Sequence, residues 1–163
     1  MGFASHLGPW LLGTVKNTTG TTAGTIRNMG AAVVTQSGLT TVSDTTATTL
    51  FVLPAGAQIN NFLVDITTAY AGTTGNTITI QTSGGTALAT VGGATTTPLA
   101  IGRATVTLSG TNMATILNVG STDLILQVVY TCAGTASGGA AQITVQYAVK
   151  DSSGNQSQPA NQQ

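Results

Sequence analysis

The sequence predicts an all-β protein, an antiparallel β-sandwich of jelly-roll type with an N-terminal extended arm and a polar C-terminal tail. Apolar and polar residues alternate with a period of two in several segments, which is typical of strands with one buried face. Turn signals rich in glycine separate these segments at short, regular distances. Helical periodicity is nearly absent, and Thr, a β-branched residue, fills about a fifth of the positions.

The strand pattern extends from residue 31 to residue 150, and we expect about eight or nine strands there. Ten segments carry the pattern, one or two of them merged or false: 31–36, 39–43, 48–53, 58–68, 76–82, 86–91, 102–108, 113–119, 123–132 and 141–149. Eight strands over about 120 residues suit a jelly roll.

The alternation assigns a face to individual residues. In the segment 58–68, we expect Phe62, Val64 and Ile66 on the buried face, with Asp65 on the polar face. A second buried face follows the longest later strand and consists of Leu124, Leu126, Val128 and Tyr130. Both sets predict strands that bury one side of a sheet against another layer.

Three regions follow from this pattern: an N-terminal arm over residues 1–30, a β-sandwich domain over 31–150 and a polar tail over 151–163. A chain of 163 residues fits one domain, and such a domain buries about 70% of the surface that its unfolded form exposes. The opening lacks the basic stretch and cleavage site of a signal peptide, so we expect it to belong to the mature protein.

Charge is scarce, at 5% of the residues where about 25% is usual. The charged side chains are Lys16, Arg27, Asp44, Asp65, Arg103, Asp123, Lys150 and Asp151. Four scattered cations make no basic stripe, so we expect no nucleic-acid partner. No apolar run is long enough to predict a membrane span. A chain with zero net charge tends to associate, which favours a subunit of a larger assembly.

The sequence offers little for catalysis, and we expect no enzyme and no cofactor. His6, the one histidine, lies in the arm without an acidic neighbour, so a catalytic triad would need a distant strand. Cys132 ends an apolar strand, where a single Cys is usually a small buried hydrophobic residue.

The four Asp residues are far apart, without the spacing of a metal site or a carboxylate pair. Asp44, Asp123 and Asp151 fall at strand ends or turns, where Asp commonly binds nearby backbone amides. Asp65 lies in mid-strand and could pair with Arg103. We expect no metal, although a calcium site built on Asp44 or Asp123 with backbone carbonyls stays open.

The best candidate for a binding site is an apolar cluster in the arm. We expect it to contact a partner through Phe3, Leu7, Trp10, Leu11 and Leu12. Trp and Leu side chains that fill small pockets contribute much of the binding energy of protein interfaces. The alternative is that the segment packs onto its own sandwich.

Two stretches resemble proteins of tailed bacteriophage virions. The segment Leu50-Phe51-Val52-Leu53-Pro54-Ala55-Gly56-Ala57-Gln58-Ile59, followed by Phe62-Leu63-Val64-Asp65-Ile66-Thr67-Thr68-Ala69-Tyr70, is similar to "LPAGA-x-I" hairpins of small phage virion proteins. The opening GFASHLGPWLLGTVKNTTGTT resembles short virion proteins of marine, podovirus-like phages. Each stretch covers about twenty residues, and the rest of the chain is similar in composition only.

The resemblance implies a capsid decoration, or cement, protein on the outer surface of the virion. Such proteins are often jelly-roll trimers that brace the shell, so the expected partners are the major capsid protein and other copies of this chain in a homotrimer. The alternative is a tail, neck or fibre component that binds host surface glycans, with Tyr70, Tyr130 or Tyr147 stacking on the sugars.

Overall fold

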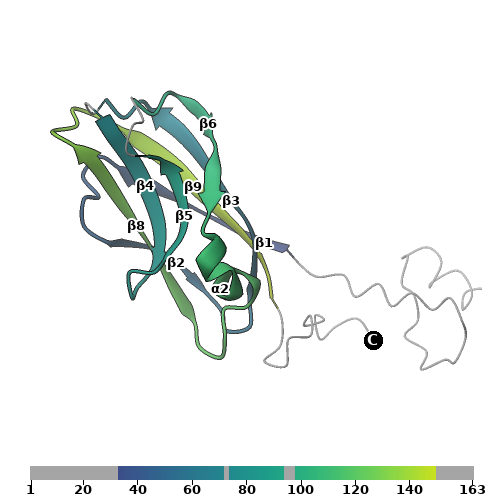
Figure 1. The fold of residues 1–163 in the computed structure, drawn as a ribbon. Coiled ribbons are helices and arrows are strands. Elements are labelled where there is room, and N and C mark those ends of the chain that lie inside the picture. The colour runs from purple at the N-terminus through teal and green to yellow at the C-terminus, as the bar shows by residue number, and fades with distance from the viewer. Residues whose placement is uncertain (1–32, 72–73, 94–97, 150–163) are drawn as a thin grey trace, which may run out of the picture.

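Two antiparallel sheets pack face to face in a computed structural model that describes residues 33–71, 74–93 and 98–149 (Figure 1). The strands are β1 (Val33–Thr41), β2 (Thr48–Leu53), β3 (Gln58–Thr68), β4 (Thr74–Thr82), β5 (Ala87–Gly92), β6 (Gly102–Ala104), β7 (Val106–Leu108), β8 (Leu124–Ala133) and β9 (Ala140–Ala148). A single 3-10 turn, η1 (Gly110–Asn112), and a short helix, α2 (Met113–Leu117), complete the described elements.

The strand order confirms the predicted antiparallel sandwich and gives it jelly-roll topology. One sheet has the order β1-β9-β3-β6, and the other has the order β2-β8-β4-β5-β7. The antiparallel pairs β1–β9, β2–β8, β3–β6 and β4–β5 are nested around one another along the chain. This nesting is what winds a long hairpin into two four-stranded sheets, with β7 added at one edge.

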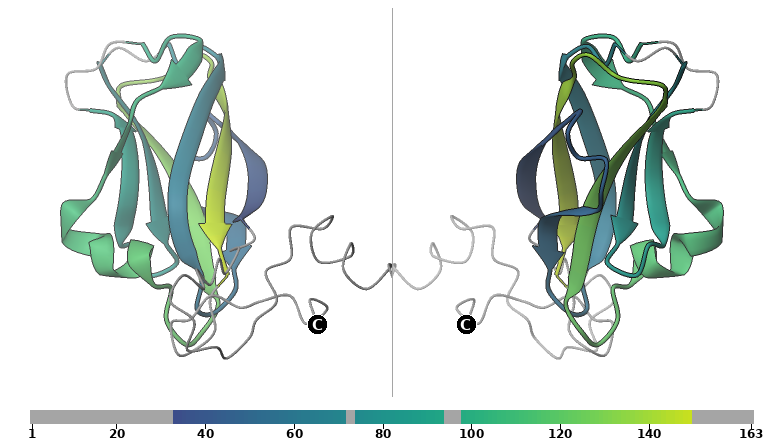
Figure 2. Two further views of the ribbon diagram at one scale, coloured as in Figure 1. Left: turned by 90° about the vertical axis from the view of Figure 1, so that its right-hand side faces the viewer. Right: turned by 90° about the vertical axis from the view of Figure 1, so that its left-hand side faces the viewer.

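The core lies between the sheets and is built from the alternating apolar residues (Figure 2). Phe62, Val64 and Ile66 of β3 are buried as predicted, and they face the other sheet. The predicted face of β8 is also confirmed, because Leu126, Val128 and Tyr130 are buried and Leu124 packs against the core.

Four predicted segments differ from the structure. The described parts of the segments 31–36 and 39–43 meet in one strand, β1, which continues through Gly38 and ends at Thr41. The segment 102–108 is broken at Thr105, where the chain passes from β6 in one sheet to β7 in the other.

The segment 113–119 was predicted as a strand and is wrong, because Met113–Leu117 forms helix α2. A short apolar run is ambiguous between helix and strand, and Met, Ala and Leu favour the helix. The helix buries Ile116 and exposes Leu117, its neighbour. Asn112 fixes the start of the helix, because its side-chain amide donates to the Ala87 carbonyl at 2.7 Å.

The predicted arm over residues 1–30 and the predicted tail over 151–163 lie outside the described residues. Their points of attachment are described. Val33 opens β1 and is the register partner of Ala148, the last residue of β9. The chain therefore enters and leaves the sandwich at the same end, where the β2–β3 turn also lies (Figure 1).

Candidate interaction surface

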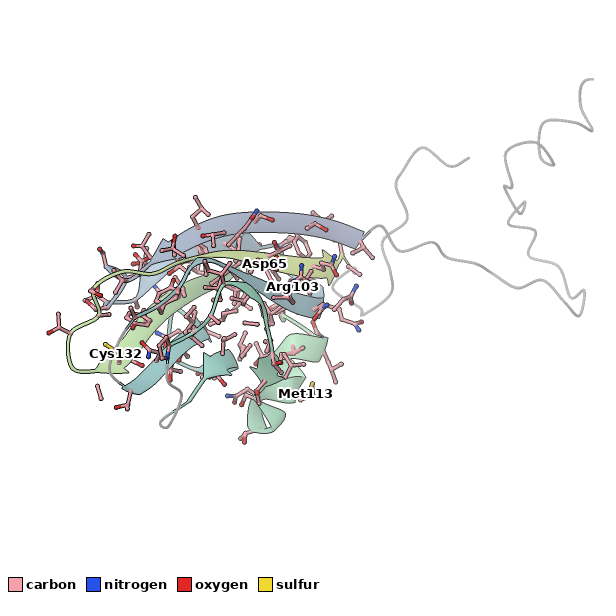
Figure 3. The ribbon with its side chains drawn as sticks, turned by 90° about the horizontal axis from the view of Figure 1, so that it is seen from above. Asp65, Arg103, Met113 and Cys132 are labelled. Atoms are coloured by element: carbon pink, nitrogen blue, oxygen red, sulfur yellow. The ribbon has the colours of Figure 1, made fainter. Side chains whose placement is uncertain are left out.

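The charged side chains of the described part of the chain are mostly engaged with other groups. Arg103 on β6 forms a two-contact ion pair with Asp65 on β3, through its Nε and through its Nη2 at 3.0 Å from Asp65 Oδ2. The predicted pairing of these two residues is confirmed, and Figure 3 shows them side by side. The hydrogen bond to Asp65 raises the pKa of Arg103 further above its already high value.

Asp44 closes the loop between β1 and β2. Its Oδ2 accepts hydrogen bonds from the Thr41 amide at 2.7 Å and the Thr40 hydroxyl at 2.9 Å. Its Oδ1 accepts one from the Thr48 hydroxyl at 3.2 Å. The predicted turn-binding role of Asp44 is therefore confirmed.

Asp123 binds a turn across the fold. Its Oδ1 accepts a hydrogen bond from the Ala55 amide at 3.0 Å, which ties the loop before β8 to the β2–β3 turn. Over residues 33–71, 74–93 and 98–149, no three His, Cys, Asp or Glu side chains lie together as a metal-binding group. Asp151 lies outside the described residues.

Two exposed aliphatic side chains lie at neighbouring positions of β2 and β8. Val52 of β2 and Ile125 of β8 are register partners, and they are 49% and 38% exposed. Val33 and Val34 at the start of β1 are 55% and 37% exposed. We call Val52 and Ile125, which lie side by side on the outer face of their sheet, the apolar edge.

Gln36 connects the two sheets beside the apolar edge. Its Nε2 donates to the Val52 carbonyl on β2 at 3.3 Å and to the Tyr147 hydroxyl of β9 at 2.8 Å. Since residues two apart share a strand face, Val34 lies on the same face of β1 as Gln36. The link holds the first half of β1 against β2 beside the apolar edge.

The outer face of the sheet formed by β2, β8, β4, β5 and β7 is uncharged. Three threonines follow one another across β7, β5 and β4 as register partners, Thr107, Thr90 and Thr79. Val129 of β8 continues this row. This face presents hydroxyl groups and aliphatic atoms and no charged side chain.

The three tyrosines do not reach the surface. Tyr70, Tyr130 and Tyr147 are all buried, so the prediction that their rings stack on sugars is wrong. Burial raises the pKa of Tyr70 to about 12. Burial also raises the pKa of Tyr130, with a further contribution from the neighbouring Cys132. The alternation placed Tyr130 on the buried face, but the position of Tyr70 depends on the loop after β3.

Cys132 is half-buried near the end of β8, far from Met113 of the helix (Figure 3). It packs against the core, and its Sγ donates to the Gly134 carbonyl at 3.1 Å. This agrees with a packing role, although the side chain is less buried than the sequence predicts.

The predicted binding residues of the arm, Phe3, Leu7, Trp10, Leu11 and Leu12, lie outside the described residues, as does His6. The apolar edge was missed at the sequence level. Its two members come from different strands, and only the register brings them together. The alternation alone marks Val52 and Ile125 as outward-facing aliphatic residues, which was the available signal.

Within the described ranges, no helix has the length and the hydropathy needed to cross a membrane. No family model matches the sequence, and no curated protein matches it. A solved structure, "Cyanophage Pam1 capsid asymmetric unit", is similar over 83% of this chain and 98% of that chain, at 15% sequence identity and a TM-score of 0.44.

Proposed function

We propose that this chain is a non-enzymatic structural protein of a phage virion, which decorates and stabilises the outer surface of the capsid. Its partners in this role are the major capsid protein and neighbouring copies of the chain, arranged as a homotrimer. The cluster of Phe3, Leu7, Trp10, Leu11 and Leu12 anchors the subunit, and the sandwich braces the shell.

One observation carries the proposal: the described domain offers partners almost no free charge. Asp65 and Arg103 neutralise each other, and Asp44 and Asp123 accept hydrogen bonds in turns. Catalysis and nucleic-acid binding both depend on charged or titratable groups that face a ligand. A rigid sandwich with aliphatic and hydroxyl surfaces is instead suited to packing among many similar subunits, and the resemblance of the "LPAGA-x-I" hairpin to phage virion proteins supports the same role.

The proposal is tested by adding purified protein to capsids of the phage that encodes it, after its own copies have been removed. We expect saturable binding at hundreds of copies per particle. Binding should change little between low salt and seawater-like salt, where the Debye length is only a few Å, because few ionic contacts are available. Binding that falls steeply with salt, or only a handful of copies per particle, would contradict the proposal.

The anchoring role of the arm is tested with Trp10→Ala, and Trp10→Phe serves as a control that keeps an aromatic ring. We expect Trp10→Ala to weaken capsid binding while the unfolding midpoint of the sandwich stays the same. A lower midpoint in Trp10→Ala would instead assign Trp10 to the core of the domain.

The alternative, a tail, neck or fibre component that binds host glycans, loses the support of the tyrosine rings, which are buried. The number of copies per particle distinguishes the two functions, since a tail component is present in few copies. Binding to a glycan array would favour the alternative.

A further inference from the structure

The two lateral sides of the sandwich end differently. At one side, the chain passes from β6 to β7 at Thr105, so one run of residues crosses from sheet to sheet. At the other side, β1 and β2 are separate edge strands of the two sheets. In the described part of the chain, β1 pairs with β9 alone, and it forms the outer margin of its sheet (Figure 2). One row of its backbone amides and carbonyls therefore faces away from the sheet.

Strand β1 lacks the features by which edge strands usually avoid pairing with other chains. Proteins shorten such strands, bulge them, or place charged residues or proline on them. Of the four edge strands described, β6 and β7 have three residues each, and β2 has a register irregularity between Thr49 and Phe51. β1 has nine residues without a charge or a proline, and its register with β9 is unbroken from Val33 to Thr41. It is therefore the edge best suited to the addition of a strand.

The outer face of β1 carries two exposed aliphatic side chains. Ser37 belongs to this face, because its hydroxyl shares an exposed hydrogen bond with the Thr144 hydroxyl of β9 at 2.8 Å. Residues two apart share a strand face, so Val33 and Leu39 lie on it as well. They are 55% and 70% exposed. A strand that pairs with β1 would therefore place its own side chains beside Val33 and Leu39.

Two copies of β1 complement each other in one antiparallel register. A two-fold axis at Gln36 places Val33 of each copy opposite Leu39 of the other, so the exposed aliphatic side chains cover each other twice. Thr35 of each copy then lies opposite Ser37 of the other. Like charges opposite each other destabilise a strand pair, and β1 has no charged residue. A contact that uses the same strand on both sides is closed, because neither copy keeps a free β1 edge.

We propose that β1 is a self-association surface, at which two copies of this chain pair through antiparallel β1 strands centred on Gln36. The pairing joins two sheets of the order β1-β9-β3-β6 into one continuous sheet and covers Val33 and Leu39. It goes beyond the capsid role and does not rest on it, since it is a property of the chain in solution. In the proposed homotrimer, a two-fold contact links two trimers and leaves the contacts within each trimer to other surfaces.

Charge substitutions at the paired positions test the strand and its register together. One double variant carries Thr35→Lys and Ser37→Lys, and a second carries Thr35→Glu and Ser37→Glu. Each variant paired with itself places like charges opposite each other, whereas a mixture of the two places opposite charges there. The matched control is Ile101→Lys with Leu117→Lys, which adds the same charge at exposed aliphatic residues outside the strands. The unfolding midpoint of each full-length protein checks that it folds.

Sedimentation over a range of protein concentrations measures association, and hydrogen exchange measures the protection of the β1 amides that face away from β9. We expect the wild type and the lysine control to associate equally, with slow exchange of these amides in the associated form. Each β1 double variant should associate on the order of tenfold more weakly. The mixture of the two variants should regain the association of the wild type.

Equal association of the wild type and both β1 variants would overturn the proposal. A mixture that stays as weak as its components would overturn the register centred on Gln36. Amides that stay protected in both variants at low concentration would assign the edge to the chain's own N-terminal segment, which also overturns the proposal. If association follows the expected pattern but capsids do not bind the protein, the capsid role fails and this inference stands. Capsid binding by a wild type that does not associate through β1 has the opposite meaning.

Discussion

The rings of Tyr70 and Tyr130 pack against each other inside the sandwich, with centroids 4.8 Å apart and planes inclined at 38°. Each hydroxyl has a buried partner. Tyr130 donates to the Asn76 side chain at 2.5 Å, and Tyr70 donates to the Thr40 carbonyl at 3.3 Å. The pair therefore connects β8 with β4 and with the end of β1, and it fills the end of the sandwich opposite the apolar edge.

The buried tyrosines predict that the fold loses stability at alkaline pH. The pKa of Tyr70 is about 12 in the folded protein and about 10 in an unfolded chain. Between these two pH values the unfolded chain has lost the phenol proton while the folded protein still holds it, which favours unfolding. The stability that comes from a neutral phenol is complete below pH 10 and is lost between pH 10 and about 12, by up to about 1.4 kcal/mol per pH unit. Urea unfolding at pH 8, 10 and 11 measures this loss.

Tyr70→Phe isolates the contribution of one ring. We expect it to cost less than about 1 kcal/mol at pH 8, because the hydrogen bond to Thr40 is long. Above pH 10 it should lose less stability than the wild type, while Tyr130 retains its own pH dependence. Identical losses in the two proteins would show that Tyr70 ionises as easily in the folded state as in the unfolded state.

Gly92 and Gly85 form a matched pair for testing backbone packing. Both have a positive φ, of 83° and 80°, which an L side chain adopts only with strain. A Cβ at Gly92 would lie 2.0 Å from the Asn76 carbonyl oxygen, whereas a Cβ at Gly85 would meet nothing within 4 Å. We expect Gly85→Ala to cost about 1–2 kcal/mol and Gly92→Ala about 3 kcal/mol or more, measured by denaturant unfolding. Equal costs would mean that the backbone near Asn76 moves to make room.

Alanine substitutions in α2 test whether residues 113–117 form a helix or a strand. Ile116 is buried and Leu117 is 52% exposed, although they are neighbours in the sequence. We expect Ile116→Ala to cost about 2–4 kcal/mol and Leu117→Ala less than about 0.5 kcal/mol. Met113 separates the two interpretations, because a strand with Ile116 inward would place Met113, Thr115 and Leu117 all outward. A helix places Met113 on the side of Ile116, so Met113→Ala should also be destabilising and Thr115→Ala should not.

The bounds of β2 and β3 follow from the sequence because two β-rich apolar segments flank a clear turn signal at Pro54 and Gly56, which separates them. The helix could not be predicted in this way, since five residues of mixed propensity carry no clear period. Tertiary packing decides their conformation, through the burial of Ile116 against β3 and β5.

The candidate surface was predictable only in part. The pairing of Asp65 with Arg103 could be inferred because few charges are present and both residues fall on polar positions. The apolar edge could not, because Val52 and Ile125 become neighbours only through the register of β2 and β8. Strand register between distant segments depends on the whole sandwich, and alternation within one strand does not contain it.

Substituting Gln36 measures how strongly its hydrogen bonds couple the two sheets beside the apolar edge. Gln36→Ala removes the hydrogen bonds to the Val52 carbonyl and the Tyr147 hydroxyl, and it leaves the Tyr147 hydroxyl without this donor in a buried site. We expect a loss of about 1–2 kcal/mol in unfolding free energy, together with faster amide exchange in β1 and β2. Ser37→Ala is the control, since its hydrogen bond to Thr144 lies on the exposed face of the same strand and should contribute less than about 0.5 kcal/mol. If the two variants were equally stable, the link through Gln36 would not hold the sheets together, and packing such as that of Leu50 against Gly38 would join β1 to β2 instead.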